Sequence, residues 1–142
     1  MKKPLTLSQE IAKNLSYYFG KDKRCKGETF CYYSGIKAGK KTQGCFVGRL
    51  LAPKDRVKAD EYFESYDYSD VSALVRLKDY IGIEIPKIIF DNVVLFVRFQ
   101  LLHDCEQYWN EEFKLTDEGK IFLKDTIKLY NLDIKDFKKF LK

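Results

Sequence analysis

Residues 88–102 form the longest apolar stretch of the chain and set the strongest limit on its fold. Their apolar side chains lie almost all round a helix, which is typical of a central helix with other helices packed around it. They are Ile88, Ile89, Val93, Val94, Phe96, Val97, Leu101 and Leu102. The wider segment from Ile83 to Leu102 contains seven polar, charged or proline residues, too many for a membrane span of about 20 apolar residues. The sequence therefore predicts a buried helix and no association with a membrane.

Further helices are indicated by signals at their ends. Thr6 and Gln9 have the spacing of a capping box before a helix over residues 7–19, and Gly20 is a typical C-terminal stop. The same reasoning predicts helices over residues 71–81, 116–130 and 133–141. The central helix is expected to continue or bend into residues 103–112. The apolar patch before Pro53 fits either a strand or a two-turn helix.

The stretch between residues 21 and 44 has a different pattern. Glycines and lysines surround one β-prone run, residues 29–33, which predicts a small β hairpin or an ordered loop near residues 25–45. The predicted fold class is α+β, mainly α, with about five helices around the long apolar central helix. The 142 residues suffice for one core, and no repeat or Pro-rich linker divides them. We therefore predict a single globular domain over residues 1–142.

The positive charge is concentrated in the first part of the chain. Residues 1–58 hold 14 Lys and Arg and 4 Asp and Glu, whereas residues 59–142 hold 12 and 17. The basic segment, which we define as Lys21 to Gly48, combines lysines with glycines and tyrosines. Glycine lets backbone N–H groups approach a phosphate, lysine supplies charge, and tyrosine offers a face on which a base can stack. The alternative is that these lysines only form a solvated surface or neutralise the acidic half.

This pattern makes a phosphate-bearing ligand, a nucleotide or a nucleic acid, the leading candidate. The predicted ligand-binding residues are Lys23, Arg24, Lys26, Tyr32, Tyr33, Lys37, Lys40 and Lys41. The phosphate-binding motif of nucleoside triphosphatases is absent, because the glycines before Lys40 and Lys41 do not have its spacing. The sequence therefore argues against that class of enzyme.

The cysteines offer a second kind of site. The N-terminus lacks the apolar core of a signal peptide, so we expect a cytoplasmic protein with reduced thiols. Zinc is one alternative, with a ligand set of Cys25, Cys31, Cys45 and either His103 or Cys105. Five residues separate Cys25 from Cys31, which does not match the usual spacing of paired zinc ligands. We therefore predict no cofactor, and cysteines that act as small buried hydrophobes.

Cys45 and His103 also supply the residue types of a thiol hydrolase. A nucleophilic cysteine needs a lowered pKa and a neighbouring base. Asp104 is adjacent to His103, but successive helical side chains point about 100° apart, so we expect that Asp104 does not orient the imidazole. The alternative, which we favour, is a buried, hydrogen-bonded His103 near Phe96 and Phe99 with a structural role.

Three segments resemble the pattern of a family of small phage and bacterial proteins. These are CYYSG at residues 31–35, QGCFVGRLLAP at 43–53 and QLLHDCEQYWN at 100–110. The family pattern is Cys-x-Tyr, then Cys-x-x-Gly-x-Leu, a proline, Leu-Gln-x-x-His-Asp and a tryptophan. The matching residues are Cys31, Tyr33, Cys45, Gly48, Leu50, Pro53, His103, Asp104 and Trp109. The resemblance implies a phage or mobile-element origin and a compact fold, and it brings no reaction with it. The expected location is then a bacterial or phage-infected host cytosol.

These observations give one predicted function and two alternatives. The predicted function is a small soluble binding protein without catalytic activity, whose basic segment binds a phosphate-bearing ligand. The first alternative is a protein-interaction module that presents an aromatic cluster to a host protein. That cluster is Tyr62, Phe63, Tyr66 and Tyr68. The second alternative is the thiol hydrolase with Cys45 and His103.

Overall fold

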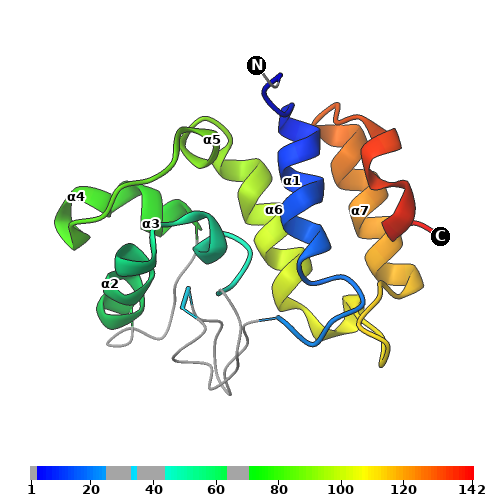
Figure 1. The fold of residues 1–142 in the computed structure, drawn as a ribbon, viewed down its shortest axis with the longest axis horizontal. Helices are drawn as coiled ribbons and strands as arrows, with labels where there is room; N and C mark the ends of the chain where they lie inside the picture. Colours follow the sequence, from blue (N-terminus) through cyan, green and yellow to red (C-terminus); the bar gives the residue numbers. More distant parts are fainter. Residues whose placement is uncertain (1–2, 25–32, 35–43, 64–70) are drawn as a thin grey trace. The chain divides into compact units, whose positions relative to one another are not determined.

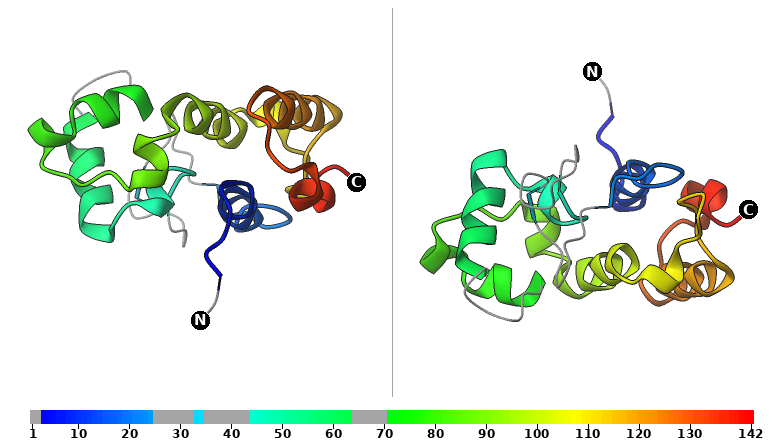
Figure 2. Two further views of the ribbon diagram at one scale, coloured as in Figure 1. Left: turned by 90° about the horizontal axis from the view of Figure 1, so that it is seen from above. Right: turned by 90° about the horizontal axis from the view of Figure 1, so that it is seen from below.

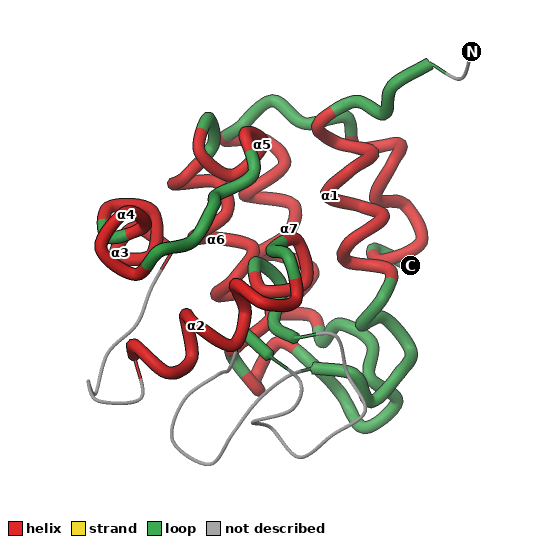
Figure 3. The backbone as a smooth tube through the Cα atoms, turned by 60° about the vertical axis from the view of Figure 1, so that its left-hand side comes forward, coloured by secondary structure: helices red, strands yellow, loops and turns green. Residues whose placement is uncertain are grey.

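The computed structural model describes residues 3–24, 33–34, 44–63 and 71–142, and every regular element in these ranges is a helix (Figures 1 and 3). The α-helices are α1 (Leu7–Ser16), α2 (Pro53–Phe63), α3 (Val71–Arg76), α4 (Lys78–Ile81), α5 (Lys87–Phe90), α6 (Val93–Asp104) and α7 (Asp117–Leu129). The 3-10 helices are η1 (Gly48–Leu50), η2 (Glu106–Tyr108) and η3 (Ile134–Phe140). No helix in these ranges is both long and apolar enough to cross a membrane.

The α+β prediction is therefore wrong, and the protein is all-α over the part that the structure describes. Its β structure there is limited to one isolated bridge between Trp109 and Leu115. Most of the expected hairpin near residues 25–45 lies outside the described residues. Within that region the structure describes Tyr33 and Ser34. Their N–H groups donate to a carboxylate on α2, whereas in a hairpin they would face solvent or a partner strand.

The chain forms two compact units. Unit 1 consists of Met1–Asp22 and Cys105–Lys142, and unit 2 consists of Lys23–Asp104. Unit 1 is thus built from both ends of the chain, and unit 2 from the continuous segment between them. The single domain over residues 1–142 stays a prediction.

In unit 1, short-range caps set the helix ends. The Thr6 hydroxyl accepts from the Gln9 N–H at 3.2 Å and the Gln9 side chain accepts from the Thr6 N–H at 2.9 Å, which confirms the capping box. Thr116 caps α7 with one such bond, in which its hydroxyl accepts from the Gly119 N–H. α1 and η3 pack together, as Figure 2 shows from above and below, with the Phe19 and Phe140 rings 5.0 Å apart.

In unit 2, α6 packs against α3, and its aromatic face meets the residues before η1. The ring of Phe46 stacks on that of Phe99 at 5.4 Å between centroids and lies 6.1 Å from that of Phe96. All three side chains are buried, which adds directional ring packing to the burial of apolar area. This core packs the residues around Cys45 against α6.

The helices of unit 2 differ from the predicted ones in their boundaries. The central helix is divided into α5 and α6 by a turn at Asp91 and Asn92, and it ends at Asp104 instead of running on to residue 112. The predicted helix over residues 71–81 is two short helices, the second of which ends at Gly82 with a φ of 83°. The sequence does not predict α2, because charged residues leave it without a clear apolar face.

Candidate functional site

The candidate site residues fall into two groups with respect to the structure. Lys23, Arg24, Tyr33, Cys45 and His103 lie in unit 2 and are described. Tyr62 and Phe63 of the aromatic cluster are also described in unit 2, and Cys105 is described in unit 1. The remaining candidates lie outside the described residues; they are Cys25, Lys26, Cys31, Tyr32, Lys37, Lys40, Lys41, Tyr66 and Tyr68. The candidate site therefore consists of the described residues that flank the lysines of the basic segment.

The first flanking residue is Arg24, which is attached to the C-terminal end of α6. Its Nη1 donates to the His103 carbonyl oxygen at 2.8 Å. Carbonyls in the last turn of a helix have no partner within the helix and carry its partial negative charge, so a guanidinium is well suited to bind there. Arg24 thus ties the start of the basic segment to α6.

The second flanking point is the pair Tyr33 and Ser34, which α2 holds through Asp60. The Tyr33 N–H donates to Asp60 Oδ1 at 2.7 Å and the Ser34 N–H to Asp60 Oδ2 at 2.9 Å. Asp60 is buried, and hydrogen bonds to a buried carboxylate are stronger than those between neutral groups. The Tyr33 side chain is buried too, with its ring 6.3 Å from that of Phe63.

Two glycines let the backbone at Tyr33 approach the turn that contains Cys45. A Cβ on Gly48 would lie 2.6 Å from Tyr33 Cα, and one on Gly44 would lie 3.0 Å from the Tyr33 carbonyl carbon. Gly44 also has a φ of 107°, which L side chains rarely adopt. Residues 33–34 and 44–48 therefore form one packed layer of unit 2, and glycine is required at both contacts.

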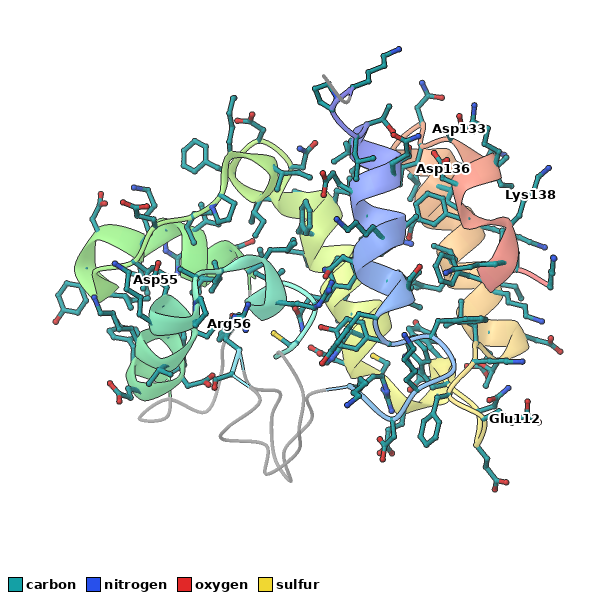
Figure 4. The ribbon with its side chains drawn as sticks, in the orientation of Figure 1. Asp55, Arg56, Glu112, Asp133, Asp136 and Lys138 are labelled. Atoms are coloured by element: carbon teal, nitrogen blue, oxygen red, sulfur yellow. The ribbon has the colours of Figure 1, made fainter. Side chains whose placement is uncertain are left out.

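Cys45 begins the turn that leads into η1. It is buried, and its Sγ accepts a hydrogen bond from the Gly48 N–H at 3.4 Å. The Arg49 N–H donates to the Cys45 carbonyl at 2.9 Å, and Arg56 on α2 donates to the Arg49 and Leu51 carbonyls (Figure 4). These bonds hold the turn in place from both sides.

His103 is fully buried, and its Nδ1 lies 2.7 Å from Asp104 Oδ1. This confirms the expectation of a buried, hydrogen-bonded histidine and corrects the expectation that Asp104 points away. Asp104 is the last residue of α6, where its side chain turns back toward the preceding ring. Because a carboxylate only accepts, the contact places the proton of a neutral imidazole on Nδ1.

Two further residues, Asp60 and Gln100, complete the arrangement. Asp60 is a buried acid on a helix otherwise rich in exposed charge, and Gln100 is a polar residue in the apolar α6. The Gln100 Oε1 accepts from the Val47 N–H at 2.9 Å, and its Nε2 donates to Asp104 Oδ1 at 2.7 Å. Gln100 lies at the glutamine of the Leu-Gln-x-x-His-Asp pattern and is a polar residue on an apolar stretch, whereas no local pattern in the sequence points to Asp60.

The remaining candidate groups show no comparable assembly. Among the described residues, no three His, Cys, Asp or Glu side chains come together as metal ligands. In the aromatic cluster, Phe63 is buried and Tyr62 is half-buried, with its ring 5.7 Å from that of the exposed Tyr80.

Searches against protein-family models, curated proteins and solved structures find no match. The function of the chain must therefore be inferred from its own residues and contacts.

Proposed function

We propose that the protein is a non-catalytic binding protein whose basic segment, Lys21 to Gly48, binds a phosphate-bearing ligand such as a nucleotide or a nucleic acid. One observation carries the proposal. Described residues at 24, at 33–34 and at 44–48 are each fixed to unit 2 by buried or half-buried hydrogen bonds. The stretches between them contain Lys26, Lys37, Lys40 and Lys41.

Binding residues are commonly carried on loops whose ends a helical scaffold fixes. Fixed ends reduce the conformational entropy that a segment loses when it binds, and so favour affinity. The sequence supplies lysine and glycine in both stretches, which is the chemistry that phosphate groups need. The combination of basic side chains and fixed ends supports a binding role more directly than a merely solvated surface.

The triple substitution Lys37→Gln, Lys40→Gln and Lys41→Gln tests this proposal. We expect weaker binding of a fluorescein-labelled oligothymidylate and a salt dependence that is flatter by about one counterion per lost phosphate contact. Fluorescence anisotropy titrations over a series of salt concentrations measure both quantities. The midpoint of thermal unfolding should stay close to that of the original protein, since Lys→Gln keeps a polar side chain and removes only its charge.

The matched control removes the same charge from unit 1. Lys124→Gln, Lys128→Gln and Lys138→Gln replace three exposed lysines of α7 and η3, of which Lys138 is labelled in Figure 4. This variant should lose little affinity. A salt dependence that is equal in the two triple variants would count against a specific role for the basic segment.

The pairing of His103 with Asp104 favours the thiol hydrolase as a second candidate. A carboxylate on Nδ1 sets the tautomer in which Nε2 can act as a base, as in catalytic triads. In that case Cys45 is the nucleophile. The complete burial of His103 and the near-complete burial of Cys45 instead favour structural roles for both.

Replacing His103 with alanine distinguishes these two roles. Because the ring is buried and hydrogen-bonded, we expect a loss of about 1 to 3 kcal/mol of folding stability from the cavity and the missing bond. Ligand binding should then decrease only in proportion to the folded fraction, which circular dichroism measures. Thioester or p-nitrophenyl ester hydrolysis that disappears in Cys45→Ser and His103→Ala at unchanged melting temperatures would reverse the assignment.

A further inference from the structure

Tyr80 on α4 has the most exposed of the large hydrophobic side chains that the structure describes, at 78%. Its ring makes an edge-to-face contact with that of Tyr62 on α2, with centroids 5.7 Å apart and an angle of 77° between the rings. The two helices pack against each other in unit 2 (Figure 1). The Tyr80 ring is therefore open to solvent and supported by a second ring.

The supporting ring is itself attached to the core of unit 2. Tyr62 makes an edge-to-face contact with Phe63, with centroids 5.0 Å apart, and Phe63 is buried. The ring of Phe63 in turn lies 6.3 Å from that of Tyr33. These contacts order the two tyrosines before any ligand is present. A side chain that is already ordered loses less conformational entropy on binding.

A lysine with a fixed position lies close to these rings. Lys58 precedes Tyr62 by one helical turn, on the same side of α2, and its Nζ donates to the Gly82 carbonyl at 3.1 Å. Gly82 ends α4 two residues after Tyr80. An ammonium group has three N–H donors, so this bond leaves two for an anion. The surface thus combines an aromatic face with a positively charged group.

We propose that Tyr80, Tyr62 and Lys58 form a base-stacking site for single-stranded nucleic acid, in which a base stacks on the Tyr80 ring and an adjoining phosphate binds Lys58. Aromatic faces beside cations are common in proteins that bind single strands, because every base has a face that can stack. This inference rests on the proposed function and narrows its ligand to a strand that carries bases. The site lies outside the basic segment and adds to it.

The surroundings of Tyr80 favour a nucleic acid over a protein partner. Protein hot spots are well packed and desolvated, and their neighbours exclude water. The residues before Tyr80 are instead Lys78 and Asp79, which pair at 3.0 Å, and the Asp79 side chain is 91% exposed. A base is uncharged, so this pair does not oppose stacking. Lys58 and the net charge of +5 attract the phosphates.

Replacing Tyr80 tests the site. Tyr80→Leu keeps an apolar side chain but has no planar face, and we expect the Kd for the fluorescein-labelled oligothymidylate to rise about fivefold to tenfold, as for one stacked base. Tyr80→Phe keeps the face and should stay within about twofold of the original. If Tyr80→Leu does not fold, Tyr80→Ala takes its place with the same expected loss. The salt dependence should not change, because no phosphate contact is removed.

An abasic strand of the same length gives an independent readout. The original protein should bind it about fivefold to tenfold more weakly than the oligothymidylate, and Tyr80→Leu should bind it as the original protein does. Lys58→Gln should instead weaken the binding of both strands and flatten the salt dependence by about one counterion. Fluorescence anisotropy measures all of these values.

Phe90→Leu is the matched control, because it removes another exposed ring of unit 2, on α5, and should leave the Kd unchanged. An equal loss in Phe90→Leu would overturn the site. If the Tyr80 variants keep the original Kd while the lysine triple variant flattens the salt dependence, the stacking site is wrong and the proposed function stands. Binding of ATP or inorganic phosphate without binding of the oligothymidylate leads to the same conclusion. If the original protein binds none of the three, both proposals fail.

Discussion

Asp60→Ala is expected to lower the free energy of unfolding by about 3 to 5 kcal/mol, one of the two largest effects of any single substitution proposed for this chain. The carboxylate is buried and accepts from the N–H groups of Tyr33 and Ser34. Alanine leaves both donors without this acceptor inside unit 2, and each such loss costs about 1 to 3 kcal/mol. Urea denaturation followed by circular dichroism measures the change.

Two companion substitutions show whether the loss of stability comes from the two hydrogen bonds to Asp60. Asp60→Asn retains one carbonyl acceptor but turns an amide N–H toward the second donor. Its free energy of unfolding should therefore lie between those of the original protein and Asp60→Ala. Asp79→Ala removes a carboxylate whose side chain is 91% exposed and should change stability by about 0.5 kcal/mol or less. Equal stability of Asp60→Ala and Asp79→Ala would mean that the Asp60 bonds contribute nothing measurable.

Gly48→Ala should lower the stability of the protein about as much as Asp60→Ala, for a steric reason. The added Cβ would lie 2.6 Å from Tyr33 Cα and 2.8 Å from its carbonyl carbon, and these are backbone atoms that no rotamer change can move. The turn from Cys45 to Gly48 must therefore separate from Tyr33. We expect a loss of about 3 kcal/mol or more in the free energy of unfolding, measured by urea denaturation.

Gly82 provides the comparison, because a Cβ there meets nothing within 4 Å and only its positive φ disfavours a side chain. Gly82→Asn should cost about 1 kcal/mol or less, since asparagine tolerates this conformation better than other residues. If Gly48→Ala were as mild as Gly82→Asn, the close packing between the two segments would be refuted.

Helix ends are the part of the fold that can be predicted best from the sequence. Thr6 caps α1 as expected, and Gly82, Thr116 and Asp133 lie at the ends of α4, α7 and η3, because capping depends on groups within about four residues of each other. Pro53, which follows the apolar patch in the sequence, is the first residue of α2. Its missing N–H has no consequence at that position, because the first N–H groups of a helix have no partner within it.

The site can be predicted only in part, because its contacts connect distant residues. Residue type alone points to Cys45, His103 and Arg24, but Asp60 is 26 and 27 positions from its two donors and Gln100 is 53 positions from Val47. No local pattern encodes such pairs. The expectation for Asp104 is wrong because the ideal angle between successive helical residues ignores the side-chain rotation available at the last position of a helix.

The division of unit 1 between two separate stretches of the chain determines the order in which the units can be completed during synthesis. Unit 2 is continuous, so all of its residues are synthesised before those of η2. α1 is made before unit 2, but the Asp133 N–H that binds its Ser8 hydroxyl and the Phe140 ring that packs on Phe19 are made after it. The helix α1 therefore lacks these packing partners while unit 2 is synthesised. Unit 2 can fold before unit 1, because unit 1 is complete only when the last residues of the chain have been made.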